Sequence, residues 1–129
     1  MSLRYDIEPR VGYLYVAITG TLAVDSAEVA LADVFAVAAR ARQPRILLDC
    51  SSLSGAWGPT ERYAVGSFIA GEMERRASQF PERPRLAIYA VAPLMDPNRY
   101  TQTVATNRGA LVRASDSLQE LLSWLGVKE

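Results

Sequence analysis

Two short segments are apolar on both faces of a strand, and they constrain the fold more than any other feature. In residues 45–49, Ile46 and Leu48 point one way and Leu47 points the other, and residues 86–91 repeat the pattern. A strand that is apolar on both sides must be covered on both sides, which is typical of the centre of a mostly parallel sheet with flanking helices. The sequence therefore predicts an α/β fold.

The other segments supply a hairpin and the helices. Residues 3–8 and 13–19 alternate apolar and polar side chains around a turn, as two antiparallel strands do, and this places an antiparallel strand at the N-terminal edge of the sheet. Later segments have helical spacing. Helices are expected from residue 25 to 42, from 59 onward, from 96 to 107 and from 115 or 116 to 125, with a short strand at 110–113. The predicted order is β-β-α-β-α-β-α-β-α in a single domain spanning residues 1–129.

Local signals predict how the helices begin. Asp25, with Glu28 three residues later, indicates a capping pair for the first helix. Asp96 followed by a proline is a typical start for the third helix, and Ser115 or Asp116 is expected to cap the last one.

Two glycines lie inside the second predicted helix. Gly66 and Gly71 each cost about 1 kcal/mol there relative to alanine. Their presence predicts that another backbone approaches this helix closely.

Composition excludes several kinds of chemistry. Fourteen basic and fourteen acidic residues cancel, so nucleic-acid binding is not predicted. The chain has no histidine, which removes Ser-His and Cys-His pairs and the usual zinc ligands, and we therefore expect no catalytic residue, no metal and no cofactor. The longest nearly apolar run, residues 29–39, is too short to cross a bilayer, and no signal sequence precedes it, so we expect a cytoplasmic protein.

The segment after the third strand is the candidate switch or ligand loop. Parallel strands deliver such loops to the start of a helix, where backbone N–H groups, hydroxyls and a carboxylate meet. Its candidate residues are Asp49, Ser51, Ser52, Ser54, Gly55 and Trp57. The simpler alternative is an ordinary strand-to-helix turn.

Each residue of this loop has two interpretations. Asp49 is expected to accept backbone N–H bonds from the residues after it rather than to accept a phosphoryl group. Cys50 is expected to be a small buried residue rather than a reactive thiol. The serines either bind an anion at the helix N-terminus or make local turn bonds. Trp57 either covers a pocket or meets a subunit, or it packs within the loop.

Basic residues gather at the opposite edge of the predicted sheet, in the two helix-to-strand turns. They are Arg40, Arg42, Arg45, Arg75, Arg76, Arg83 and Arg85. Cations stabilise helix C-termini, which accounts for this placement without any partner. The functional alternative is contact with anionic lipid headgroups or an acidic protein surface.

The second face of the predicted sheet needs a cover. Leu47, Ala87, Tyr89 and Val91 lie there, whereas most helices are expected on the other face. We predict a helix folded across it, then a homodimer, then a lipid-like ligand, in that order.

The whole succession resembles the STAS domain class, named for sulfate transporters and anti-sigma-factor antagonists, and within it the SpoIIAA-like branch, which is related to CRAL-TRIO lipid carriers. The resemblance rests on the opening hairpin, on a strand that ends in Leu48-Asp49 before small polar residues, and on the closing helix over residues 115–126. It implies a right-handed β-α superhelix and a non-enzymatic regulatory module that binds a protein partner or itself. The alternative that it implies is a binder of a small apolar or amphipathic ligand, or of membrane surfaces.

Anti-sigma-factor antagonists of this class carry a phosphorylatable serine in an Asp-Ser-Ser-Gly stretch. Residues 49–55 are the nearest match here, with Ser54-Gly55 in the place of its Ser-Gly end. Leu53 stands where the class has serine, and Trp57 and Pro59 precede the helix.

Overall fold

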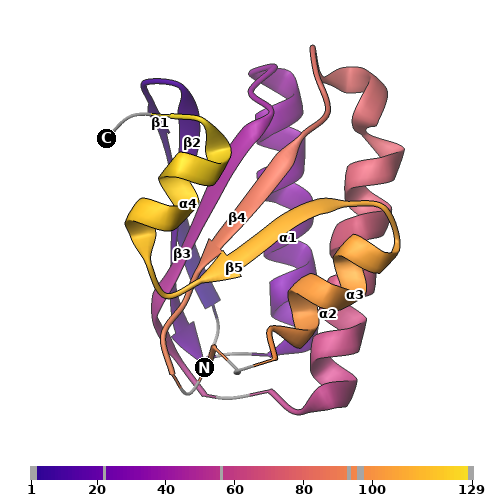
Figure 1. Cartoon of the computed structure of the whole chain (residues 1–129). Coiled ribbons are helices and arrows are strands. Elements are labelled where there is room, and N and C mark those ends of the chain that lie inside the picture. The colour runs from indigo at the N-terminus through magenta and orange to yellow at the C-terminus, as the bar shows by residue number, and fades with distance from the viewer. Residues whose placement is uncertain (1–2, 22, 56, 93, 96–97, 128–129) are drawn as a thin grey trace.

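The computed structural model of the protein describes residues 3–21, 23–55, 57–92, 94–95 and 98–127, and over these it contains one five-stranded sheet with helices on both faces (Figure 1). In chain order the elements are β1 (Leu3–Arg10), β2 (Tyr13–Thr21), α1 (Val24–Arg40), β3 (Arg45–Ser54), α2 (Pro59–Arg75), a 3-10 turn (Ala77–Gln79), β4 (Arg85–Tyr89), α3 (Tyr100–Asn107), β5 (Leu111–Ser115) and α4 (Leu118–Leu125). The predicted order of elements and the α/β class are confirmed.

The strands lie side by side in the order β1-β2-β3-β4-β5. β1 pairs with β2 antiparallel, and the remaining pairs are parallel. The two segments that are apolar on both faces, β3 and β4, lie inside the sheet, as their pattern predicts.

The main core lies between one face of the sheet and helices α1, α2 and α3. Leu14, Val16 and Ile18 of β2 and alternate residues of β3 point into it, and Phe35 of α1 is fully buried against them. Apolar side chains recur at every second position in the strands and with helical spacing in α1, so each element has one continuous apolar surface. Burial of these two surfaces against each other is the main stabilising contribution of the fold.

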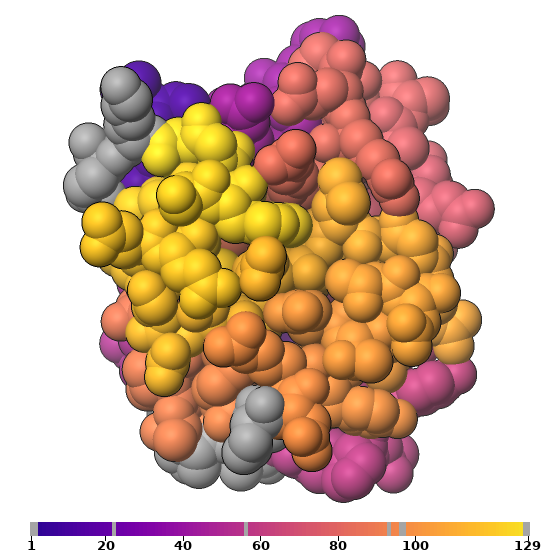
Figure 2. All heavy atoms as spheres, viewed as in Figure 1, coloured from indigo at the N-terminus to yellow at the C-terminus, as the bar shows by residue number. Residues whose placement is uncertain are grey.

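The second face is covered by α4, which lies on the side of the sheet opposite α1 (Figure 1) and forms a layer of atoms over it in Figure 2. Leu121, Leu122 and Leu125 pack there against Leu47 and Ala87 of the central strands, with Tyr13 beside them. The first-ranked expectation, a helix folded across this face, is confirmed.

Two of the predicted helix caps are wrong. The N-cap of α1 is Ala23, without a side-chain cap, and Asp25 lies in the first turn where its charge still suits the helix dipole. Ser117, rather than Ser115 or Asp116, caps α4 by accepting a bond from the Glu120 N–H. Asp96 and Pro97, the expected start of the third helix, lie outside the described residues, and α3 begins at Tyr100.

The two helix glycines differ in their surroundings. A Cβ at Gly66 would lie 2.8 Å from the Thr101 carbonyl oxygen and 2.9 Å from the Val104 Cβ, so α2 and α3 touch there backbone to backbone. A Cβ at Gly71 would meet only the end of the Arg75 side chain, at 3.5 Å. The prediction of a close approach is confirmed for Gly66 and wrong for Gly71.

Candidate functional site

The polar segment after residue 49 belongs to a strand, not to a loop. β3 continues to Ser54, pairing Ser52 with Thr19 and Ser54 with Thr21, after an irregularity in register between Ala17 and Thr19. The expected loop over residues 49–54 is therefore wrong, and the connection to α2 spans only residues 55–58. The irregularity shifts the alternation of side chains by one position, which hides the strand pattern in the sequence.

Asp49 is held by three hydrogen bonds. The Tyr15 hydroxyl donates to its Oδ2 at 2.5 Å, and the Ser51 N–H and hydroxyl donate to its Oδ1 at 3.0 and 2.6 Å. The predicted bond from a following backbone N–H is present. Tyr15 was not predicted, because its approach to Asp49 depends on the register between β2 and β3.

These bonds set the charges of the pair. Burial is the largest single influence and raises the pKa of Asp49, but hydrogen bonds from Ser51 and Tyr15 together outweigh it and hold that pKa below its ordinary value. The same bond to Asp49, with burial, raises the pKa of Tyr15 to about 12. At neutral pH Asp49 is thus a carboxylate with both oxygens engaged, and Tyr15 is its neutral donor.

Replacing Tyr15 by phenylalanine is expected to lower the free energy of unfolding by about 1 kcal/mol between pH 5 and 9, a value reduced for solvent screening because the pair is half-exposed. The lowered pKa of Asp49 contributes stability that is present above the unfolded value of about 4 and is lost as pH falls. The raised pKa of Tyr15 contributes stability that is present below about 10 and is lost as pH rises toward 12. Urea unfolding of both proteins across pH should therefore show a difference that shrinks at each end.

The control for this pair is Tyr5→Phe. The Tyr5 hydroxyl donates to Asp33 at 2.8 Å in an exposed setting, so its loss should cost less than about 0.5 kcal/mol. A Tyr15→Phe difference that stays constant from pH 3 to 11 would contradict the assignment.

Two of the three serines, Ser51 and Ser54, make local side-chain hydrogen bonds at the end of β3. Ser51, Ser52 and Ser54 are exposed, and the Ser54 hydroxyl donates to the Gly20 carbonyl at 3.0 Å. Gly55 turns the chain with a φ of 101°, in the left-handed region that glycine favours. The Ser54-Gly55 pair thus lies at the surface with its hydroxyl directed at its own sheet.

The N-terminus of α2 already holds a carboxylate. The Gly58 N–H donates to Glu61 Oε1 at 2.9 Å, and Glu61 lies in the first turn of the helix. The Glu61 carboxylate occupies the position that a bound anion would take. A negative charge of the chain itself therefore already stabilises the N-terminus of α2. The local interpretation of the serines fits this geometry better than anion binding does.

Trp57 borders an apolar cavity of about 90 Å³ between the sheet and the helices. It is half-buried against the main core, and its carbonyl accepts a bond from the Arg62 Nε at 3.0 Å. Cys50 lines the same cavity, and burial raises the pKa of its thiol to about 12, so this thiol stays protonated. The structure favours the pocket interpretation of Trp57 and the buried-residue interpretation of Cys50.

Sequence reasoning missed the rest of this cavity wall. Leu94, Met95 and Arg99 line it from the segment between β4 and α3. Short turn-like segments with one or two apolar residues have no period, so nothing in the sequence indicates that they fold back over the strand ends.

The arginines at the opposite edge mostly bind groups of their own chain. β3 and β4 set Arg45 beside Arg85, so both turns lie at one edge as expected. Arg45 pairs with Glu82 at 3.4 Å, and the Arg85 Nη1 donates to the Trp124 carbonyl at 2.8 Å.

Three of the remaining arginines follow the same pattern, and two are placed by helix α1. Arg75 and Arg76 both pair with the buried Glu72, and Arg83 donates to the Gly109 carbonyl. Arg40 lies in the last turn of α1, and Arg42, with a φ of 54°, follows that helix. The helix-dipole explanation and these internal partners account for the basic edge without an external ligand.

Within the described ranges, no three acidic, cysteine or histidine side chains gather to hold a metal ion. Helices long and apolar enough to span a bilayer are likewise missing from that part of the chain.

Comparison with known proteins identifies the fold. No family model matches the sequence, and no curated protein matches it significantly. Among solved structures the chain is similar to an anti-sigma factor antagonist from Mycobacterium paratuberculosis, with 12% identity, a TM-score of 0.60, and coverage of 97% of this chain and 95% of that one. It is also similar to an uncharacterized protein of the DUF3478 family from Shewanella loihica PV-4 with a SpoIIAA-like fold, with 18% identity, a TM-score of 0.54, and coverage of 96% and 94%.

The chain therefore has the SpoIIAA-like fold. The resemblance to SpoIIAA-like proteins that the element order indicates is thus confirmed at the level of the fold.

Proposed function

We propose that this protein is a non-enzymatic interaction module that contacts a protein partner through the end of β3 and the start of α2. The contact surface, here called the β3–α2 strip, consists of Ser51, Ser52, Ser54, Gly55 and Trp57. The observation that carries the proposal is the exposure of three hydroxyl-bearing residues on a rigid strand end, beside a half-buried tryptophan. Aromatic side chains at such positions are frequent anchors of protein interfaces.

The state of the nearby reactive groups supports binding rather than chemistry. Asp49 has both oxygens engaged by donors, and the Cys50 thiol is buried and protonated. Neither is prepared to act as a base or a nucleophile at neutral pH. The similar Mycobacterium structure is of an anti-sigma factor antagonist, a protein named for its action on another protein.

The experiment is site-specific photo-crosslinking in cells of the source organism. A photoreactive amino acid at Ser52 in the strip is compared with the same group at Val11, a fully exposed turn residue at the other end of β2. We expect a defined protein adduct from position 52 that is absent from position 11. The partner, once purified, should bind the Ser52→Arg variant about tenfold more weakly at unchanged stability, since one bulky charge at an interface centre costs at least 1.4 kcal/mol.

Identical adducts from both positions, or none from position 52, would overturn the proposal. Mass spectrometry of the protein from the same cells tests the phosphorylation switch, because that version of the function requires phosphate on Ser51, Ser52 or Ser54. A protein that binds its partner through the strip and never carries phosphate there is an interaction module without that switch.

A second candidate function is the binding of a small apolar or amphipathic ligand, and the cavity beside Trp57 favours it. The cavity has a volume of about 90 Å³, which is smaller than that of engineered protein cavities that hold benzene. It therefore has room for only a few carbon atoms. A ligand would therefore be small, or would insert one end of an alkyl chain.

Titration of a Trp124→Phe variant with hexanol tests this candidate, because the fluorescence of that variant comes from Trp57 alone. We expect a saturable change that is lost in Ala30→Leu, a variant that fills the cavity from α1. The absence of a saturable change, together with no added mass in native mass spectrometry of freshly purified protein, would refute ligand binding there.

A further inference from the structure

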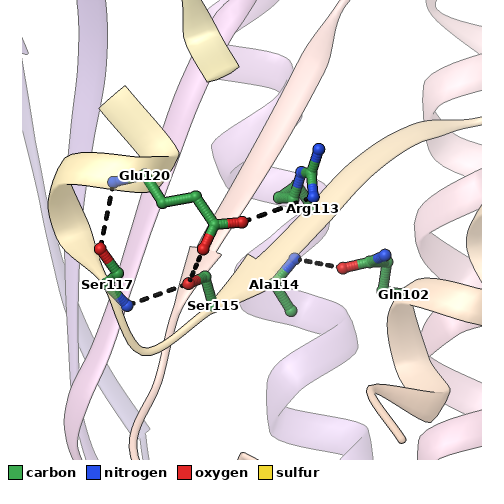
Figure 3. Close-up of polar contacts among 6 residues, drawn as sticks. All are labelled: Gln102, Arg113, Ala114, Ser115, Ser117 and Glu120. Atoms are coloured by element: carbon green, nitrogen blue, oxygen red, sulfur yellow. Dashed lines mark hydrogen bonds and ion pairs between the residues drawn. The ribbon is translucent and has the colours of Figure 1, made fainter. Parts of the chain in front are cut away.

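The sheet has two outer edges, and the one at β5 is already in use. The Ala114 N–H of that strand donates to the Gln102 side-chain oxygen at 2.7 Å, and Arg113 beside it pairs with Glu120 at 3.4 Å (Figure 3). The other edge is β1, the outermost strand at the opposite side of the sheet (Figure 1). All eight residues of β1 are half-buried or exposed. β1 is therefore the edge that another extended segment can reach.

The turn after β1 shows which of its backbone groups point outward. Arg10 pairs with Tyr13 across a two-residue turn, and residues in these positions face each other. The direction alternates along an antiparallel strand, so every second residue before Arg10 faces away from β2. The outward set is Leu3, Tyr5, Ile7 and Pro9. Pro9 has no N–H, which agrees with this assignment, because proline is tolerated in a sheet where no ladder bond is needed.

The outward groups are free to bind another chain. Over the described residues, no hydrogen bond beyond the pairing of β1 with β2 reaches the backbone of Tyr5 or Ile7. The charged side chains of Arg4 and Asp6 are exposed and, in the same part of the chain, take part in no ion pair or hydrogen bond. This edge therefore offers both backbone groups and charges to a second molecule.

The residues of this edge are complementary to themselves. Two antiparallel copies of β1 related by a two-fold axis at Tyr5 place Leu3 opposite Ile7 of the other copy. The same register places Arg4 of each copy opposite Asp6 of the other. Apolar residues thus meet on the core face of the sheet and opposite charges meet on the second face, and both kinds of cross-strand pair are stabilising.

Neighbouring registers lack this complementarity. An axis at Asp6 would set the two Asp6 carboxylates opposite each other, and an axis at Arg4 would do the same with two guanidinium groups. An axis at Ile7 would set Asp6 opposite Glu8. Like charges directly opposite each other destabilise a strand pair, so the charges select the register with its axis at Tyr5.

Apolar surface continues from this edge onto α1. The Tyr5 hydroxyl donates to Asp33 of α1 at 2.8 Å, so that side of the helix lies toward β1. Val29 lies one turn before Asp33 on the same side of the helix and is 69% exposed. A two-fold axis beside β1 places both α1 helices on one side of the joined sheet, which turns each Val29 toward the other copy.

We propose that β1 is a homodimerisation edge, at which two copies of the chain pair antiparallel through residues 3–7 and join their sheets into one. An interface built on one short strand is small, so the dimer is reversible and forms at micromolar concentrations or above. The pairing leaves β3 inside the sheet, and the β3–α2 strip stays available to another protein. Either proposal can therefore fail without the other.

Sedimentation of the full chain without an N-terminal tag, from about 1 µM to about 1 mM, tests the proposal. We expect a reversible equilibrium between monomer and dimer. Arg4→Asp sets carboxylates opposite each other and Asp6→Arg sets guanidinium groups opposite each other, so each change alone should weaken the dimer about tenfold or more. Arg40→Asp, the same change at an exposed position of α1, should alter it by less than about twofold.

Two rescue experiments separate the paired charges from net charge. The double variant Arg4→Asp with Asp6→Arg restores opposite charges in the register and should dimerise about as tightly as the original chain. An equimolar mixture of the two single variants should form mixed dimers, because one variant supplies two carboxylates and the other two guanidinium groups. In the ¹⁵N-labelled original chain, the amide resonances of Tyr5 and Ile7 should shift with protein concentration, whereas that of Val11 should not.

Three outcomes would overturn the proposal. The first is a chain that stays monomeric over the whole concentration range. The second is a dimer that Arg4→Asp and Asp6→Arg leave unchanged, which would place the contact on another surface. The third is a dimer that both single variants weaken and that neither the double variant nor the mixture restores, which would exclude the register with its axis at Tyr5.

Discussion

Replacing Leu125 by alanine is expected to lower the free energy of unfolding by about 3 kcal/mol and the Tm by about 10 °C. Leu125 is fully buried at the end of α4, in the cluster that covers Leu47 and Ala87. The change removes apolar contact area and leaves a cavity between a short helix and the sheet, which an eight-residue helix has few other contacts to offset. Thermal and urea unfolding measure the loss.

The matched control is Leu118→Ala in the same helix. Leu118 is 38% exposed, so its truncation should change stability by less than about 0.5 kcal/mol. If Leu118→Ala and Leu125→Ala lower the free energy of unfolding equally, the leucines contribute through helix propensity and not by covering the second face of the sheet. An increase of dye binding to apolar surface in Leu125→Ala alone would support the assigned role.

Replacing Gly66 by alanine should destabilise the protein by about 2 kcal/mol, although alanine is the better helix former. The new Cβ would lie within 3 Å of the Thr101 carbonyl oxygen and the Val104 Cβ, and a backbone oxygen cannot move aside as a flexible side chain does. The helices α2 and α3 would have to separate, and urea unfolding should report the cost.

Gly71→Ala in the same helix should instead stabilise the protein. Its Cβ would meet only the Arg75 side chain at an ordinary distance of 3.5 Å, so the helix propensity of alanine should add up to about 1 kcal/mol of stability. Destabilisation by both substitutions, or by neither, would show that contact between α2 and α3 at Gly66 is not as close as described.

Local patterns were sufficient for the elements and for their order. The alternation in β1 and β2 and the two-sided apolar pattern of β3 and β4 depend only on the period of a strand, and they place each segment in the sheet. The prediction of helix starts is less accurate, because several polar residues near each start can cap the helix. The backbone path decides among them, as Ser117 shows in α4.

The candidate site shows where such reasoning stops. Small polar residues at positions 51–54 predict a loop, because they are typical of turns, yet β2 is long enough to pair with them up to Ser54. The size of Trp57 in a glycine-rich segment marks it as a candidate in the sequence. Its neighbours across the cavity, Leu94 and Met95, carried no signal of their own.

The spacing of apolar residues along each element is enough to predict the α/β class, the order of elements, the central position of β3 and β4, and the need for a cover on the second face of the sheet. The bond from Tyr15 to Asp49 and the meeting of Trp57 with Leu94 and Met95 around one cavity follow from the tertiary structure alone. Contacts of this kind join residues far apart in the chain, such as Tyr15 and Asp49, 34 positions apart. They depend on strand register and on helix placement, which the packing of the whole core sets.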